Sequence, residues 1–115
     1  SINRNKESIA LNLKSPEDKL IFDKLLLSAD VLIENYTPGT IEKLGYGWDF
    51  LNKTYPKLTL ASISGFGQTG PYRELPAYDM VVQAMGGILS ITGEEGGRPT
   101  RVGVSIGDLA AGMFA

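Results

Sequence analysis

The sequence predicts an α/β fold, specifically a partial Rossmann-like parallel sheet with flanking helices. Strand-like and helix-like segments alternate along the first 64 residues in the order β-α-β-α-β, which is typical of parallel sheets covered by helices. The composition, 43% hydrophobic and 21% charged, is that of a globular protein. With 115 residues, the chain corresponds to one partial α/β domain spanning residues 1–115.

The first elements are defined by their capping residues and periodicity. Residues 8–13 (SIALNL) alternate and predict a strand. Ser15 as N-cap and Pro16 at the first helical position predict a helix that runs to about Ser28. The apolar residues 31–33 then predict a short buried strand that ends at the Glu-Asn-Tyr sequence following it.

Two further helices and a strand complete the β-α-β-α-β pattern. Thr37-Pro38 marks the start of a helix for which Gly45 is a plausible stop. Residues 48–54 predict a short helix that Pro56 terminates, and residues 58–64 (LTLASIS) predict a strand.

The second half of the chain is richer in glycine. A loop is expected over residues 65–76, followed by a helix over residues 78–89 that contains the pair Gly86-Gly87. Residues 101–105 are expected to be extended, and Asp108 is expected to open a final helix.

Several classes of function are excluded or disfavoured by composition. A net charge of −2 and a pI near 5.0 argue against a nucleic-acid partner. The chain shows neither an apolar run of membrane-spanning length nor a signal peptide. The absence of cysteine fits a cytoplasmic location, and the absence of both cysteine and histidine excludes thiolate nucleophiles, Ser–His–Asp triads and the usual zinc sites. We therefore expect no metal, and chemistry based on carboxylates, lysine, tyrosine, hydroxyls or backbone dipoles.

Both ends of the chain suggest a fragment. The sequence opens at Ser1 without an initiator methionine, and it stops at Met113-Phe114-Ala115 inside an apolar helical pattern. We expect the chain to be a piece of a longer protein.

Residues 65–70 (GFGQTG) form a literal G-x-G-x-x-G after a predicted strand, so a dinucleotide site has to be considered. The context disfavours it, because Pro71 and Pro76 prevent the helix on whose N-terminus the pyrophosphate would lie. A tight loop at a strand end fits better, and such loops remain the places where parallel sheets bind ligands.

Two segments carry groups suited to a nucleotide with several phosphates. Arg4 and Lys6 form either a solvated loop, which we favour on sequence alone, or a phosphate clamp. At the strand-to-helix junction, Asn35 and Tyr36 form either an ordinary turn or a site where backbone N–H groups hold an anion and the ring stacks on a base. Lys43, one helical turn further on, is either a second cation for the nucleotide or an ordinary surface lysine.

Asp108 is the candidate nucleophile. An aspartate at this position is usually a helix N-cap, but glycines at positions 103, 107 and 112 leave room for close approach to the carboxylate. A helix N-terminus also keeps the acid ionised, as a carboxylate nucleophile requires. Asp79 has the same N-cap interpretation with fewer glycines around it.

The order of these segments resembles one known family. NRNK-x-SIALNLK, ADVLIENYTPG, LASISGFGQTGPY, YDMVVQAMGG and VGVSIGDLAAGMFA follow one another with the spacing of class III CoA-transferases, the group of the formyl-CoA and carnitine-CoA transferases. The resemblance covers essentially the whole chain. The blocks ENYTPG and SGFGQTGPY and the terminal GD-x-x-x-G are its specific parts.

The resemblance implies a role for each candidate residue. Asp108 would be the catalytic aspartate. The CoA-binding residues would be Arg4 and Lys6 at the phosphates, Asn35, Tyr36 and Lys43 at the nucleotide, and Gly65, Phe66 and Gly67 at the acyl or pantetheine end.

The resemblance also implies a reaction and partners. CoA, a substrate and not a cofactor, would pass from an acyl-CoA to a small carboxylic acid through an anhydride and a thioester on Asp108. Family members are longer and form homodimers of interlocked, ring-like subunits, so self-association is expected. The alternatives are a non-catalytic CoA-binding or self-associating fragment, an NAD-binding domain, and an α-methylacyl-CoA racemase. The racemases carry a histidine at the position of Tyr78, whereas this chain contains no histidine.

Overall fold

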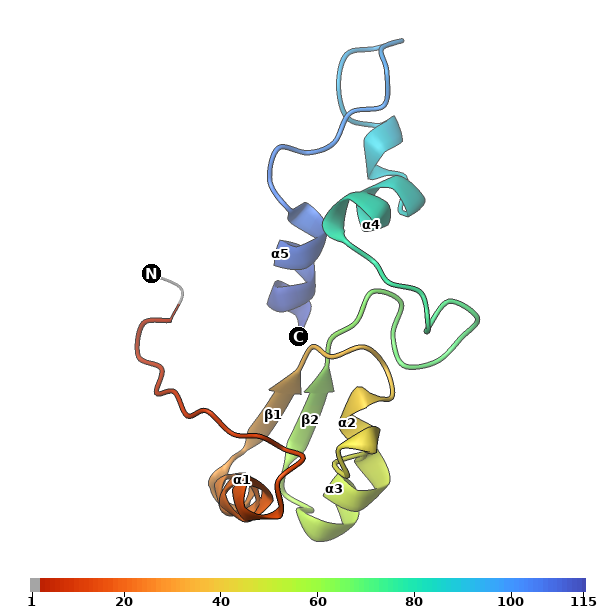
Figure 1. The fold of residues 1–115 in the computed structure, drawn as a ribbon. Coiled ribbons are helices and arrows are strands. Elements are labelled where there is room, and N and C mark those ends of the chain that lie inside the picture. The colour runs from red at the N-terminus through yellow and green to blue at the C-terminus, as the bar shows by residue number, and fades with distance from the viewer. Residues whose placement is uncertain (1–2) are drawn as a thin grey trace.

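The computed structural model describes residues 3–115 and divides them into two parts (Figure 1). We call residues 15–62 the α/β part and residues 77–115 the α4–α5 part; the loop of residues 63–76 joins them. The molecule is elongated, with principal extents of 58 × 36 × 25 Å. The elements in chain order are α1 (Pro16–Ser28), β1 (Val31–Glu34), α2 (Thr40–Lys43), α3 (Trp48–Thr54), β2 (Thr59–Ser62), α4 (Asp79–Met85), the 3-10 turn η1 (Ile88–Ser90) and α5 (Ile106–Phe114).

The sheet consists of β1 and β2, which pair in parallel with Val31 opposite Thr59 and Glu34 opposite Ser62. The predicted α/β class with a parallel sheet and flanking helices is therefore confirmed. Parallel pairing places the carboxyl ends of both strands at one edge, and in Figure 1 this edge points toward α5. The residues that follow each strand consequently meet there.

The strand predicted over residues 8–13 is wrong. This segment is extended but carries no strand assignment, and most of its residues are exposed. Alternating residues favour an extended backbone, but a strand also needs a neighbour for its N–H and C=O groups, and β1–β2 is the only strand pair among residues 3–115. The strand at 31–33 is also less buried than predicted, because Val31 and Ile33 are exposed and only one face meets the core.

Local backbone chemistry accounts for most helix boundaries. Helix α1 starts as predicted, with the Ser15 hydroxyl accepting a hydrogen bond from the Asp18 amide at 3.4 Å. Helix α2 begins only at Thr40, since Gly39 before it has φ +83°, a left-handed conformation that cannot continue a helix. The helix predicted over residues 78–89 ends at Met85 for the same reason: Gly87 has φ +81°. Residues 101–105 carry no strand assignment.

The apolar core lies in the α/β part, between α1, α2, α3 and one face of the sheet. Leu51 of α3 is 1% exposed and is the most buried apolar residue of the core. The other buried members of the core are Leu26, Ile41, Tyr46, Tyr55 and Leu58. Aromatic rings pack edge to face through it, with Phe22 and Tyr46 at a centroid separation of 4.8 Å.

A carboxylate ties two core tyrosines to α1. The hydroxyls of Tyr46 and Tyr55 donate hydrogen bonds to the same oxygen of Asp23, at 3.0 and 3.1 Å. Burial first, and then the bond to Asp23, raise the pKa of Tyr46 to about 12 and also raise the pKa of Tyr55. The neutral tyrosines are thus favoured in the folded state.

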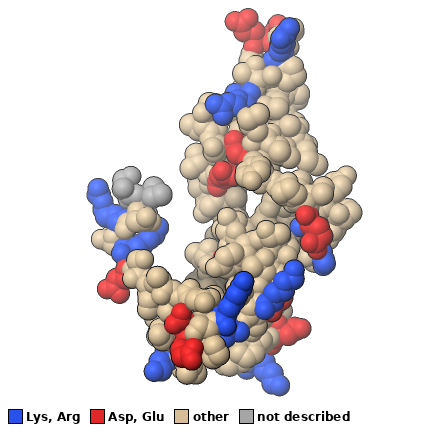
Figure 2. All heavy atoms as spheres, viewed as in Figure 1, with Lys and Arg blue, Asp and Glu red and all other residues tan. Residues whose placement is uncertain are grey.

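The surface is mixed in charge. Figure 2 shows acidic and basic side chains scattered over one face, with no continuous basic area. None of the helices within residues 3–115 combines the length and apolar character that crossing a membrane requires.

We expect Leu51→Ala to lower the free energy of unfolding by about 2–5 kcal/mol, because it removes buried apolar contacts and leaves a cavity. Urea unfolding followed by far-UV circular dichroism measures the change. Leu27→Ala is the matched control, since Leu27 is 75% exposed and its truncation should cost less than about 0.5 kcal/mol. Equal losses in the two variants would contradict the assignment of the core.

We also expect the free energy of unfolding to fall as the pH rises from about 10 to about 12. The folded-state pKa of Tyr46 lies above its unfolded value of about 10, so this stabilisation is complete below pH 10 and is lost as the pH passes the folded pKa. Urea unfolding across this range measures the slope. Tyr46→Phe removes one of the two titrating tyrosines and should make the slope shallower, with the remainder due to Tyr55; identical slopes would contradict the argument.

Candidate active site

Two adjoining cavities lie at the carboxyl edge of the sheet. The first, of about 380 Å³, is lined by residues 35–38, 64–65 and 74–78. The second, of about 530 Å³, is lined by Asn35, Ile63, Ala77, Tyr78, Asp79, Asp108, Ala111 and Gly112. Because Asn35, Ala77 and Tyr78 line both, the two cavities adjoin, and together they make up the candidate site.

Asn35 joins the ends of the two strands. Its side-chain Nδ2 donates to the carbonyl of Ile63 at 2.6 Å, just beyond β2. The next residue, Tyr36, donates its backbone N–H to Oε2 of the buried Glu34 at 2.8 Å. These bonds hold the backbone of the ENYTPG segment, while the Tyr36 side chain lines the first cavity and is 47% exposed.

The glycine loop after β2 borders the same site and opens no helix. Residues 65–78 carry no helix assignment, so the pyrophosphate-binding helix of a dinucleotide site is lacking there. Gly65 lines the first cavity, and a Cβ at this position would overlap the side chain of Ala77. Gly67 has φ +80°, and the ring of Phe66 packs edge to face on Tyr72 at 5.7 Å.

One hydroxyl in the first cavity has no partner. The Ser64 Oγ is buried and makes no hydrogen bond with any of the residues 3–115. A buried hydroxyl without a partner costs free energy, which a bound polar group would recover.

Asp108 lies in the first turn of α5, and the N-cap interpretation is wrong. The helix begins at Ile106 with Ser105 as its N-cap, so Asp108 is the third helical residue. Its side chain is exposed and lines the second cavity, and no described residue gives its carboxylate a hydrogen bond or an ion pair.

Asp79 lines the same cavity, but each of its carboxylate oxygens already accepts a hydrogen bond. Its Oδ1 accepts from the backbone N–H of Gly107 at 2.8 Å, and its Oδ2 accepts from Nε2 of Gln83 at 2.7 Å. The expectation that Asp79 caps its own helix is wrong, because it bonds to the N-terminus of α5 instead. Sequence reasoning missed Gln83, although a lone amide inside the apolar stretch MVVQAM was a signal for it.

The basic candidates lie elsewhere. Arg4 and Lys6 are in a turn of the N-terminal arm, where the Lys6 backbone N–H donates to the Asn3 carbonyl at 3.3 Å. Lys43 is the exposed last residue of α2. None of the three lines either cavity. Their role at CoA remains a prediction, whereas Asn35, Tyr36, Gly65 and Asp108 each line one or both of the adjoining cavities.

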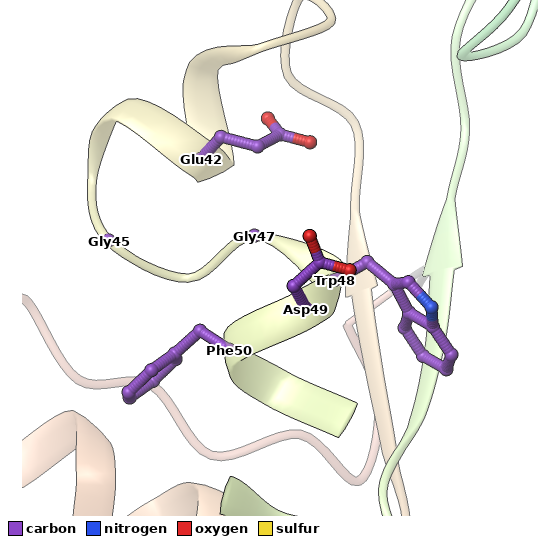
Figure 3. Close-up of a pocket in the computed structure, with 6 residues that line it drawn as sticks. All are labelled: Glu42, Gly45, Gly47, Trp48, Asp49 and Phe50. Carbon is purple, nitrogen blue, oxygen red and sulfur yellow. The ribbon is translucent and has the colours of Figure 1, made fainter. Parts of the chain in front are cut away.

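A third hollow, between α2 and α3, is chemically different (Figure 3). It has a volume of about 360 Å³ and is lined by Glu42, Gly45, Gly47, Trp48, Asp49 and Phe50. Two carboxylates and no cation line it, so it is poorly suited to the phosphates of a nucleotide.

Comparison with known proteins gives consistent results. The family model described as CoA-transferase family III matches residues 1–115. An acetyl-CoA:oxalate CoA-transferase of Acetobacter aceti is 53% identical over 98% of this chain and 29% of its own length. The human succinyl-CoA:glutarate CoA-transferase is 44% identical over all of this chain and 26% of its own length.

A solved structure agrees with these sequences. The crystal structure of a CAIB/BAIF family protein from Brucella suis superposes with a TM-score of 0.91 and 39% identity over 97% of this chain and 30% of that one. This chain thus spans between a quarter and a third of the length of such relatives. Since the family model covers all 115 residues, the chain belongs to CoA-transferase family III.

Proposed function

We propose that this chain carries the nucleophile and part of the CoA-binding site of a CoA-transferase that moves CoA from an acyl-CoA to a small carboxylic acid. The observation that carries the proposal is the difference between the two aspartates of the second cavity. Asp79 has both oxygens engaged, whereas Asp108 has no partner among the described residues and faces the cavity. Of these two carboxylates, only that of Asp108 is free to react.

The first half of the proposed reaction loads CoA onto the protein. The Asp108 carboxylate attacks the thioester carbonyl of the acyl-CoA, CoA leaves as a thiolate, and a mixed anhydride forms. The thiolate then attacks the aspartyl carbonyl of that anhydride. The first acid leaves as its carboxylate, and an aspartyl-CoA thioester remains on Asp108.

The second half runs the same chemistry with the incoming acid. Its carboxylate attacks the aspartyl thioester, releasing the thiolate and forming a new anhydride. The thiolate attacks the acyl carbonyl of this anhydride, which gives the new acyl-CoA and regenerates the Asp108 carboxylate. Each step exchanges activated acyl groups of similar energy, so the cycle consumes no nucleoside triphosphate.

We propose that the remaining site residues bind CoA. Asn35 lines both cavities, so it lies between Asp108 and the side of the site where Tyr36 and Gly65 are found. We infer that CoA extends from the first cavity into the second and brings its thioester to Asp108. Relatives are named for oxalate, glutarate, citramalate and malate, which are all dicarboxylic acids. We propose an acceptor of this class.

Trapping with hydroxylamine tests the nucleophile. The chain is incubated with acetyl-CoA, succinyl-CoA or formyl-CoA and then with hydroxylamine, and intact and peptide masses are recorded. An aspartyl anhydride or thioester should be converted to a hydroxamate at Asp108. Asp108→Ala and Asp108→Asn should give none, because neither side chain has a carboxylate to activate.

Asp49→Ala is the matched control. Asp49 is also an exposed carboxylate in the first turn of a helix, but it lies in the hollow between α2 and α3. This variant should form the hydroxamate at Asp108 as the unmodified chain does. A hydroxamate at other carboxylates, or one that persists in Asp108→Asn, would contradict the assignment of the nucleophile. CoA binding without any hydroxamate would favour a non-catalytic CoA-binding chain.

A further inference from the structure

The contact between α4 and α5 is built around a polar side chain. Gln83 of α4 is 0% exposed, and it is the only buried residue of the α4–α5 part, residues 77–115. Four of the apolar side chains there, Met80, Met85, Leu109 and Met113, are more than half exposed, and others such as Leu89 and Ile106 are half-buried. The one side chain that is fully buried within residues 77–115 is therefore a hydrogen-bonded amide.

Both the nitrogen and the oxygen of the Gln83 side-chain amide form hydrogen bonds. Its Nε2 donates to Oδ2 of Asp79 at 2.7 Å and lies 3.5 Å from the carbonyl of Val104. Its Oε1 accepts from the backbone N–H of Val102 at 2.9 Å. A carboxylate on one side and an N–H on the other allow only one orientation of the amide.

Asp79 extends this chain of bonds to α5. Its second oxygen accepts from the backbone N–H of Gly107 at 2.8 Å. The approach is tight, since a Cβ at Gly107 would lie 3.1 Å from that oxygen. The backbone from Val102 to Gly107 is thus held at both ends by the Gln83–Asp79 pair, and Asp108 is the next residue.

We propose that Gln83 is a positioning residue: through Asp79 it fixes the N-terminal turn of α5 and thereby directs the Asp108 carboxylate into the cavity. This inference rests on the proposed function of Asp108. Gln83 does not line the cavity, so it acts without touching the substrate. Because Gln83 is buried and both ends of its amide are bonded, any other orientation would leave a buried polar group unsatisfied.

The same bonds explain how two aspartates in one cavity differ in their chemical role. The oxygens of Asp79 that would attack a thioester are both occupied by N–H donors, which lowers their nucleophilicity. Asp79 therefore contributes geometry, and Asp108 contributes the reacting carboxylate.

A charge exchange tests the proposal. Gln83→Glu places two carboxylates at the 2.7 Å contact, and Asp79→Asn leaves an NH2 group facing one of the two N–H donors, Gln83 Nε2 or the Gly107 amide. The double variant Asp79→Asn/Gln83→Glu restores every close bond with the roles reversed. The new amide at position 79 would donate to the new carboxylate at position 83. The amide oxygen at position 79 would accept from Gly107, and the second carboxylate oxygen at position 83 would accept from Val102.

Two measurements are made on each variant. The first is the rate of hydroxamate formation at Asp108 in the trapping assay. The second is backbone hydrogen exchange at Val102 and Gly107, which needs no reaction. We expect each single variant to react at least about tenfold more slowly, because displacing a reacting group by even a fraction of an ångström is costly, and to exchange both amides faster. The double variant should recover to within about threefold, as expected for a directly coupled pair.

Gln83→Glu adds a pH signature. Two carboxylates in contact share one proton readily, so at lower pH the protonated carboxyl group at position 83 donates to Asp79 as the amide did. Relative to the unmodified chain at the same pH, the single variant should therefore regain trapping and exchange protection as the pH falls, and lose both as the pH rises. A purely structural loss would show no such recovery. Asn52→Asp, which adds the same charge at an exposed position on α3, is the control.

The outcomes separate this inference from the proposed function. Single variants that react and exchange like the unmodified chain would overturn the positioning role. So would a double variant that regains exchange protection but not trapping, because Asp79 would then act on the substrate directly. If the unmodified chain forms no hydroxamate, the proposed nucleophile fails, and the exchange measurements alone decide whether Gln83 positions α5. Should a single variant unfold, the double variant and Gln83→Glu at low pH still decide.

Discussion

The parallel pairing of β1 with β2 is the constraint on which the site depends. It brings both strands to an end at the same edge of the sheet, so the segments after Glu34 and Ser62 must turn side by side. The bond from Asn35 Nδ2 to the Ile63 carbonyl closes this edge at 2.6 Å. The first cavity is the space that remains between the two turning segments, and it would not exist if the strands ran antiparallel.

The two parts of the molecule are stabilised by different physical interactions. The α/β part has an apolar core centred on Leu51, with edge-to-face aromatic pairs and two tyrosine hydroxyls on Asp23. The α4–α5 part has a single buried residue within residues 77–115, Gln83, and its hydrogen bonds. Burial of apolar area is tolerant of small shifts, whereas a satisfied polar network is directional. The directional part is the one that carries the candidate nucleophile.

Hydrogen bonding also distinguishes the two aspartates of the second cavity from one another. Asp79 and Asp108 line one cavity, and both lie in the first turn of a helix, so the helix dipole acts on each alike. They differ in partners: Asp79 receives two N–H donors and Asp108 receives none from the described residues. The proposed division between a structural and a reactive carboxylate rests on this difference in N–H donors.

The sequence alone determined the local structure and the family. Capping residues, glycines and periodicity defined α1, β1, α3 and β2 closely, because these elements depend on neighbouring residues. It could not show that residues 8–13 lack a strand partner, because strand pairing depends on contacts distant in the chain. The start of α5 before Asp108 was missed, although Ser105-x-x-Asp108 is a local signal for it. Only the tertiary structure placed Asn35 and Asp108 on one cavity and showed that Asp79 and Gln83 are bonded to the α5 N-terminus and the segment before it. The reason is that hydrogen-bond partners 19 to 28 residues apart leave no periodic trace in a sequence.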